Sequence, residues 1–140
     1  MIVCIDTNAV LGMFGRGAPL LVLRQALLAG RFTWALSTEI LLEYEEVATR
    51  EMGAAGAARM VRFIELVAQT RGAIQHVSPT FRFRAIPSDP DDDKFADCGI
   101  TAGAEFVITE DRHFHALNDA GYKPKPITPE EFIRRHLGIA

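Results

Sequence analysis

Residues 87–100, PSDPDDDKFADCGI, concentrate negative charge: five aspartates, at positions 89, 91, 92, 93 and 97, fall close together. Neighbouring carboxylates repel one another and raise each other's pKa values, so such a cluster needs a physical reason. Three reasons are open at this point: a solvated loop, a calcium-binding loop, or one wall of a metal-dependent active site.

The calcium loop fails on its spacing. An EF-hand needs acids at its positions 1, 3 and 5, a glycine at position 6 and a glutamate at position 12. Asp89, Asp91 and Asp93 match the first three positions, but Lys94 takes the place of the glycine and Ile100 that of the glutamate. The loop would therefore lack its sharp turn and its bidentate ligand.

The two remaining explanations apply to different parts of the cluster. A solvated loop and helix N-terminus, which most charge runs form, would account for residues 89–92, and we prefer it for Asp89 and Asp91. Asp93 and Asp97 differ, because a spacing of four places both carboxylates on one helical face. Like charges there are mildly destabilising, and a cation would reverse that effect.

The elements that must position these acids follow from the hydrophobic pattern. Strands that alternate with helices predict an α/β fold with a mainly parallel sheet covered on both faces. The predicted strands are at 2–5, 31–36, 73–77, 105–109 and 123–127, and the predicted helices are at 8–14, 19–30, 39–52, about 54–70, from about 91 to 102, 113–121 and from a capping box at 128–131 onward.

Asp6 and Asp111 follow two of these strands, and ligands of parallel sheets bind beyond the carboxyl ends of the strands. Asp6 has a second explanation, because an aspartate after a strand often caps the next helix, here through the amide of Asn8 or Ala9. Taken singly, capping is the better explanation. The coincidence of Asp6 and Asp111 with Glu43 on a flanking helix favours a joint site.

Several carboxylates that converge without basic partners cost several kcal/mol unless a divalent cation neutralises them. Oxygen ligands without Cys or His point to Mg²⁺ or Mn²⁺. Cys4 and Cys98 show no zinc spacing and are expected to be small buried apolar residues.

Composition narrows the class of protein. The 140 residues, 49% hydrophobic and 24% charged, predict one globular domain spanning 1–140. The first residues lack a basic region and no apolar run could span a membrane, so we expect a cytoplasmic protein. A net charge of −3 argues against a broad basic surface that binds nucleic acid by charge alone, but not against a nucleic acid held through a metal.

Four stretches, CIDTNAVL, LSTEILLEYEEV, DPDDDKFADCGITAGAEFVITEDRHF and ITPEEFI, together resemble the PIN domain family. The similarity covers essentially the whole chain in the right order, and it is close to the VapC-like PIN toxins of bacterial toxin–antitoxin modules. This resemblance implies an α/β/α sandwich and a metal-dependent ribonuclease. It also implies an RNA substrate and a cognate antitoxin protein, with a homodimer as an open alternative.

The resemblance assigns the acids. It implies catalytic and metal-binding roles for Asp6, Glu43, Asp93 and Asp111, with Asp97 as a fifth metal ligand. Asn8 and Thr109 match small polar positions that orient the acids, although turn and cap roles explain them equally well. The chain departs from the family at 99–101, where alanines are more common, and at Glu110, where glycine is common.

The mechanism implied is hydrolysis of an RNA phosphodiester by a metal-bound water, with in-line attack that leaves a 5′-phosphate. Basic residues flank the acidic segments and could contact the RNA backbone, although solvated rim residues are commoner: Arg82, Arg84, Arg112, His113 and His115.

Two other functions were weighed. In an aspartate-based phosphotransfer domain, of the haloacid-dehalogenase or receiver type, Asp6 would be the nucleophile. Such domains need a lysine near the acids late in the fold, for which Lys94 is the one candidate, and the stretch DTN lacks the second dehalogenase aspartate. A catalytically silent RNA- or protein-binding module would need a broken set of acids, which this sequence does not show.

Overall fold

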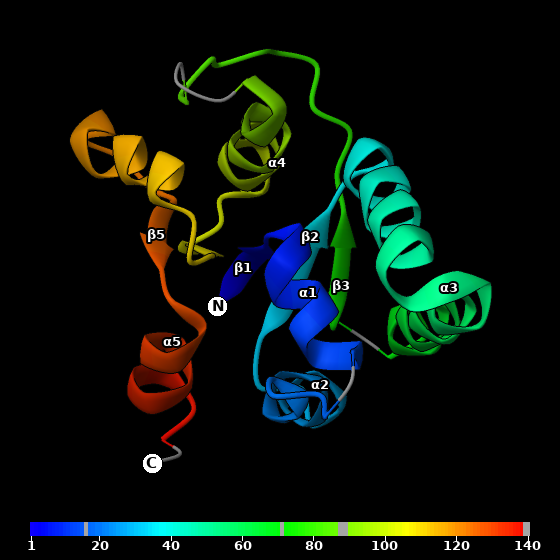
Figure 1. Cartoon of the computed structure of the whole chain (residues 1–140). Helices are drawn as coiled ribbons and strands as arrows, with labels where there is room; N and C mark the ends of the chain where they lie inside the picture. The colour runs from blue at the N-terminus through cyan, green and yellow to red at the C-terminus, as the bar shows by residue number, and fades with distance from the viewer. Residues whose placement is uncertain (16, 71, 87–89, 139–140) are drawn as a thin grey trace.

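The computed structural model describes residues 1–15, 17–70, 72–86 and 90–138, so Asp89 lies outside the described residues. The described chain forms a five-stranded parallel sheet in the order β3-β2-β1-β4-β5, which confirms the predicted fold class (Figure 1). The strands are β1 (Ile2–Ile5), β2 (Thr33–Leu36), β3 (Ile74–His76), β4 (Phe106–Ile108) and β5 (Lys125–Ile127).

The helices agree with the predicted ones, with three differences. Gly53, at φ 75° and ψ 172°, kinks one long segment where two helices were predicted; residues 112–120 form a 3₁₀ helix; and a 3₁₀ turn precedes the helix of the acidic cluster. The helices are α1 (Thr7–Phe14), α2 (Leu21–Leu28), α3 (Thr38–Ala68), η1 (Pro90–Asp92), α4 (Asp93–Ala102), η2 (Arg112–Ala120) and α5 (Pro129–His136).

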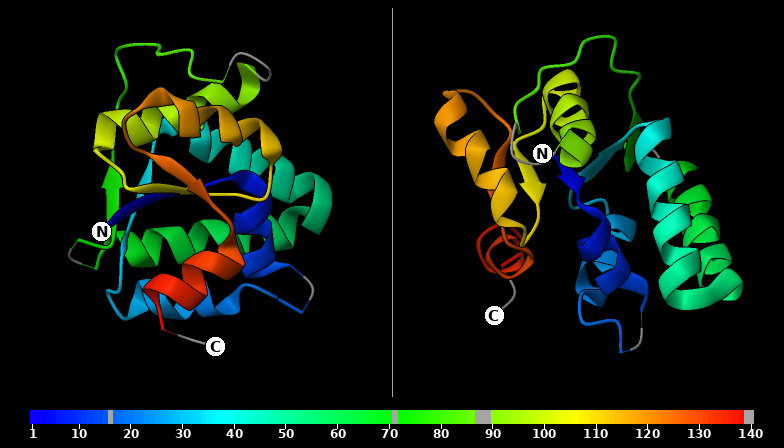
Figure 2. Two further views of the ribbon diagram at one scale, coloured as in Figure 1. Left: turned by 90° about the vertical axis from the view of Figure 1, so that its left-hand side faces the viewer. Right: turned by 45° about the horizontal axis from the view of Figure 1, so that its top comes forward.

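The strand order determines which face each helix covers. The chain runs from β1 outward to β2 and β3, and then crosses back to β4 and β5 on the other side of β1. Right-handed crossovers therefore place α1, α2 and α3 on one face and α4 and η2 on the other. Figures 1 and 2 show this three-layer arrangement, with α4 and η2 on the side of the sheet away from α1 and α2.

The core lies on both faces of the central strand. Val3, Cys4 and Ile5 of β1 are fully buried, and Cys98 of α4 is buried against them, so both cysteines are buried free thiols as predicted. Gly99 allows this close approach, since a Cβ there would lie 2.8 Å from Cγ of Pro124 and 3.5 Å from Sγ of Cys4. Alanine would not fit at this position without movement.

All five strands point the same way, so their carboxyl ends share one edge of the sheet. β1 and β4 are neighbours in the sheet. Helix α1, which follows β1, and helix α4, which precedes β4, lie on opposite faces of the sheet. Such a point is where open parallel sheets bind their ligands. Asp6 directly follows β1, and the segment 109–111 directly follows β4. Among the described residues, no helix combines the length and apolar character needed to cross a membrane.

Candidate active site

Asp6 is held by three hydrogen bonds at the start of α1. Its Oδ1 accepts from the backbone N of Asn8 at 2.8 Å and of Ala9 at 3.3 Å, and its Oδ2 accepts from the hydroxyl of Thr109. The capping role is therefore confirmed, and it uses one carboxylate oxygen. The second oxygen accepts from Thr109, directly after β4, so the cap also links the ends of β1 and β4.

Thr109 joins the two strand ends. Its Oγ1 donates to Asp6 and accepts from the backbone N of Asp111 at 2.9 Å. One buried hydroxyl therefore sets the position of Asp6 relative to the segment that carries Asp111. Both roles that the sequence leaves open for Thr109 are compatible with this geometry, since the hydroxyl contacts Asp6 and also binds the amide two residues on. Asn8 is the other predicted orienting residue, and its backbone amide donates a hydrogen bond to Asp6. Asn8 as a whole is exposed.

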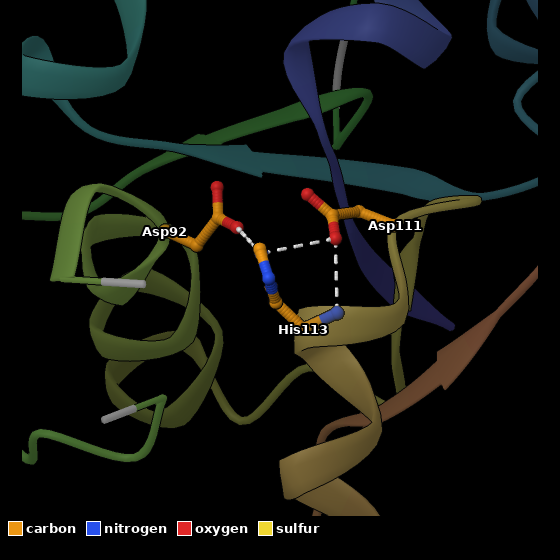
Figure 3. A group of neighbouring side chains, drawn as sticks. All are labelled: Asp92, Asp111 and His113. Carbon is orange, nitrogen blue, oxygen red and sulfur yellow. Dashed lines mark hydrogen bonds and ion pairs between the residues drawn. The ribbon is translucent and has the colours of Figure 1, made fainter. Parts of the chain in front are cut away.

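Asp111, Asp92 and His113 form the one group among the described residues whose carboxylate or ring atoms could together hold a metal ion, all lying within 4.8 Å of one another. Figure 3 shows the His113 ring between the two carboxylates. Its Nδ1 lies 3.3 Å from Oδ1 of Asp111 and 4.0 Å from Oδ2 of Asp92, and the backbone N of His113 donates to Asp111 at 2.9 Å.

Glu43 approaches from α3 and has two partners. Its Oε2 accepts from the hydroxyl of Thr7, the residue next to Asp6, and its Oε1 lies 2.5 Å from Nζ of Lys94. Burial lowers the pKa of Lys94, but the hydrogen bond and charge of Glu43 outweigh it and the pKa is raised overall. Lys94 is therefore a charged counter-ion of Glu43.

Asp93 and Asp97 lie on one face of α4, as predicted, and both bind the chain that leads into the acidic cluster. Oδ1 of Asp93 accepts from the backbone N of Ile86 at 2.9 Å, and Oδ1 of Asp97 accepts from the backbone N of Phe83 at 2.9 Å. Neither is in the group of Asp92, Asp111 and His113. Their roles as metal ligands stay predictions.

Burial perturbs two of the carboxylates. Burial raises the pKa of Asp6, and the charge of Asp111 adds to this, while the hydrogen bonds from Thr109, Ala9 and Asn8 oppose it. Burial likewise raises the pKa of Asp97, with Asp93 adding to the effect and the amide of Phe83 opposing it. Asp6 and Asp111 therefore interact electrostatically, as expected of members of one site.

The predicted RNA-contacting residues form no buried site. Arg82, Arg84, Arg112, His113 and His115 are all exposed, on the segment before α4 and on η2. Both segments lie beyond the carboxyl edge of the sheet, because one follows β3 and the other follows β4. Exposed guanidinium groups beside an acidic site are suited to phosphate contacts.

The donor set fits a divalent ion. Ligand atoms on opposite sides of an octahedral Mg²⁺ are roughly 4.2 Å apart, given metal–oxygen distances of about 2.1 Å. The atoms of Asp92, Asp111 and His113 lie within 4.8 Å of one another, a limit wider than that value, so a bound ion would draw them closer together. The nitrogen of His113 is a donor that transition ions accept more readily than Mg²⁺ does.

The pattern-based prediction passed over Asp92, Thr7 and the ligand-like position of His113. The sequence places Asp92 in a charge run at 89–92, which most often forms a solvated loop and helix N-terminus. The structure has a 3₁₀ turn at Pro90–Asp92, and a 3₁₀ turn holds 3.0 residues where an α-helix holds 3.6. Asp92 is the last residue of this turn, and its carboxylate lies in the group with Asp111 and His113.

A model of the PIN domain family matches residues 2–113, which is most of the chain. The chain therefore belongs to the PIN domain family. No match was found among curated proteins.

Two solved structures share the fold. One is VapBC2 from Rickettsia felis bound to a DNA fragment from their promoter: TM-score 0.55, 16% identity, 81% of this chain and 91% of that chain covered. The other is VapBC-1 from nontypeable Haemophilus influenzae: TM-score 0.59, 16% identity, 93% of this chain and 99% of that chain covered. At this level of identity the likeness concerns the fold alone.

Proposed function

We propose that the chain is a single nuclease domain that hydrolyses RNA phosphodiester bonds with Mg²⁺ or Mn²⁺, as an endoribonuclease. The observation that supports this most directly is the meeting of Asp92, Asp111 and His113 at the switch point of a PIN-family sheet, with Asp6 close to Asp111. Thr109 joins Asp6 to the segment that carries Asp111, and His113 lies between Asp92 and Asp111. Such an arrangement of oxygen donors is suited to a divalent cation.

The residues best placed to hold the ion are Asp92, Asp111 and His113, with Asp6 beside them. The sequence adds Glu43, Asp93 and Asp97 to this set. When bound, the ion would supply a water of lowered pKa and positive charge beside the scissile phosphate.

The protein's own contribution is position. The hydroxyl of Thr109 and the amides at the start of α1 hold both oxygens of Asp6 in place. The hydroxyl of Thr7 donates to the carboxylate of Glu43 and so fixes it on one side. Carboxylates held in this way need little reorganisation when an ion and a phosphate arrive.

We also propose that the protein acts as the toxin of a toxin–antitoxin pair in the cytoplasm, with a cognate antitoxin protein as its partner. The fold likeness to the two VapBC structures and the resemblance of the sequence to VapC-like toxins support this proposal. A homodimer is compatible with it and is tested by measuring the mass of the purified protein in solution.

The deciding experiment incubates the purified protein with single-stranded RNA and with DNA of the same sequence, in Mg²⁺, in Mn²⁺ and in excess EDTA. We expect cleavage of RNA with either metal, little or none of DNA, and none in EDTA. Asp111→Asn should remove the activity, whereas the exposed Glu130→Gln on α5 is a charge-matched control that should keep it. RNA cleavage undiminished in EDTA would contradict the proposal.

The geometry disfavours the phosphotransfer alternative. Lys94, the one candidate for the lysine that such a domain needs near its aspartate, is paired with Glu43 at 2.5 Å. A trapped aspartyl-phosphate at Asp6 after incubation with a phosphoryl donor would reverse this conclusion.

A further inference from the structure

The segment that leads from β3 to η1 carries the sequence Phe81-Arg82-Phe83-Arg84, in which every residue is exposed. The Phe81 side chain is 64% exposed and that of Phe83 is 36% exposed, and their ring centroids are 4.8 Å apart. Single exposed apolar residues are ordinary on a protein surface, but two touching aromatic rings between two arginines are not. In Figure 1 this green segment arches beside the start of α4.

The two carboxylates on the buried face of α4 hold this segment in place. Asp97 accepts a hydrogen bond from the backbone N of Phe83, and Asp93 accepts one from that of Ile86, each at 2.9 Å. Ile86 itself is fully buried. The aromatic pair is therefore displayed on a backbone that is anchored on both sides of Arg84, so its exposure is built into the fold.

The anchored segment forms one wall of a cleft of about 290 Å³. Phe81 and Arg82 line it on this side, the hydroxyl residues Ser37 and Thr38 line it from the start of α3, and Lys94 also lines it. The volume lies at the small end of the range for ligand sites, which suits one nucleotide. Because Lys94 also contacts Glu43, the cleft adjoins the candidate active site.

We propose that this cleft and the aromatic pair bind an unpaired nucleotide of an RNA strand next to the site of cleavage. The base stacks on the rings of Phe81 and Phe83, and Arg82 and Arg84 contact the adjoining phosphates. This inference rests on the proposed ribonuclease function and assigns a base-stacking position beside its site of cleavage.

The physical chemistry favours single strands. Proteins bind unpaired nucleotides by stacking bases on exposed aromatic rings beside basic side chains, and bases inside a duplex are not available for such contacts. The net charge of −3 means that general attraction to phosphate is weak, so local stacking must supply much of the affinity. Glu39 and Asp97, which also line the cleft, would further disfavour binding by charge alone.

The test measures binding separately from cleavage. A short single-stranded RNA containing one 2-aminopurine is titrated with the protein in EDTA, and its affinity and fluorescence quenching are recorded. The variants are the pair Phe81→Leu/Phe83→Leu, which keeps apolar side chains but removes the rings, and Phe81→Tyr/Phe83→Tyr, which keeps the rings. Tyr122→Leu is the matched control, since Tyr122 is 48% exposed and precedes β5, at the opposite edge of the sheet.

We expect the double leucine variant to bind about tenfold more weakly and to lose the quenching, since one base stacked on a ring corresponds to a factor of roughly five to a hundred. The double tyrosine and Tyr122→Leu variants should behave as wild type, and all should melt at the wild-type temperature. A fully paired duplex of the same sequence should be bound more weakly than the single strand, with no dependence on the rings.

Two results would overturn the inference. If the double leucine variant binds and quenches as wild type does, the rings do not contact RNA. If that variant keeps RNA binding but loses binding to a partner protein, the surface is a protein interface. Either result leaves the ribonuclease proposal intact as long as wild type cleaves RNA with metal. An active-site failure would appear differently, as stacking-dependent binding without any metal-dependent cleavage.

Discussion

Nζ of Lys94 lies 2.5 Å from Oε1 of Glu43, within a half-buried ion pair whose side chains are 15% and 24% exposed. An ammonium group therefore occupies a cation position next to a carboxylate that the sequence predicts to be a metal ligand. If Glu43 binds the ion, the lysine and the ion compete for the same charge. If Glu43 only positions Thr7, they do not.

Replacing this lysine separates the two roles of Glu43. We expect Lys94→Met to raise the affinity for Mn²⁺ about tenfold, because removing one positive charge at short range in a partly buried site is worth on the order of 1–2 kcal/mol. Calorimetric titration with Mn²⁺ measures the effect. Lys123→Met is the control, since Lys123 forms a 3.0 Å pair with Glu105 in an exposed setting away from the site. Equal Mn²⁺ affinities of Lys94→Met and wild type would remove Glu43 from the ligand set.

A second prediction concerns the register of the acidic cluster. The geometry places Asp92 with Asp111, whereas Asp93 and Asp97 bind backbone amides of the preceding segment. We expect Asp92→Asn to lower the affinity for Mn²⁺ at least tenfold. Asp93→Asn and Asp97→Asn should also reduce RNA cleavage, as the sequence predicts, and should loosen the segment that carries Phe83.

Hydrogen exchange at the amides of Phe83 and Ile86 distinguishes loosening from loss of a ligand. Faster exchange in Asp93→Asn and Asp97→Asn, with metal affinity kept, assigns these two residues to positioning. Asp91→Asn is the control, because Asp91 is exposed and was assigned to the solvated loop. If Asp91→Asn lowered the affinity for metal as much as Asp92→Asn, the assigned register of the acidic cluster would be wrong.

A third prediction treats Asp6 as both cap and site residue. Without metal, Asp6→Asn should melt at or above the wild-type temperature, because an amide still caps α1 and the repulsion from Asp111 is gone. Asp6→Ala should lose about 1 kcal/mol of the free energy of unfolding, as loss of a cap does. Millimolar Mg²⁺ should raise the melting temperature of wild type more than that of either variant. A wild-type melting curve indifferent to Mg²⁺ would argue against a preformed metal site.

A fourth prediction follows from the raised pKa values of Asp6 and Asp97, each of which starts from an ordinary value of 3.8. A buried acid with a raised pKa binds its proton more tightly in the folded than in the unfolded state. Its contribution to stability is therefore full below the ordinary pKa and is lost as the pH rises through the raised value.

The measurement is urea unfolding in EDTA from pH 4 to pH 8. The asparagine side chain does not titrate, so wild type alone pays for ionising residue 6. The free energy of unfolding of Asp6→Asn should therefore rise relative to that of wild type as the pH rises. Glu130→Gln, on the exposed surface of α5, should track wild type over the same range. A constant difference between wild type and Asp6→Asn across the pH range would show that the pKa of Asp6 is not raised.

The sequence by itself determined the order of the strands and helices along the chain, because that information is local. Apolar residues repeat with the periods of strands and helices, and Asp6, Ser37 and Thr128 cap helices through amides two or three residues away. Parallel strands share one carboxyl edge, so the sequence also predicted that Asp6 and Asp111 would meet. Thr109, which joins them, lies within the same local pattern.

Only the tertiary structure decided which carboxylates face one another. Asp92, at the end of a 3₁₀ turn, meets Asp111 from another segment of the chain, and Glu43 meets Lys94 because α3 and α4, far apart in sequence, pack together. The exposure of Phe81 and Phe83 depends in the same way on amides held by α4. Side-chain direction across such contacts is set by packing between segments, and hydrophobic periodicity within one segment carries no information about it.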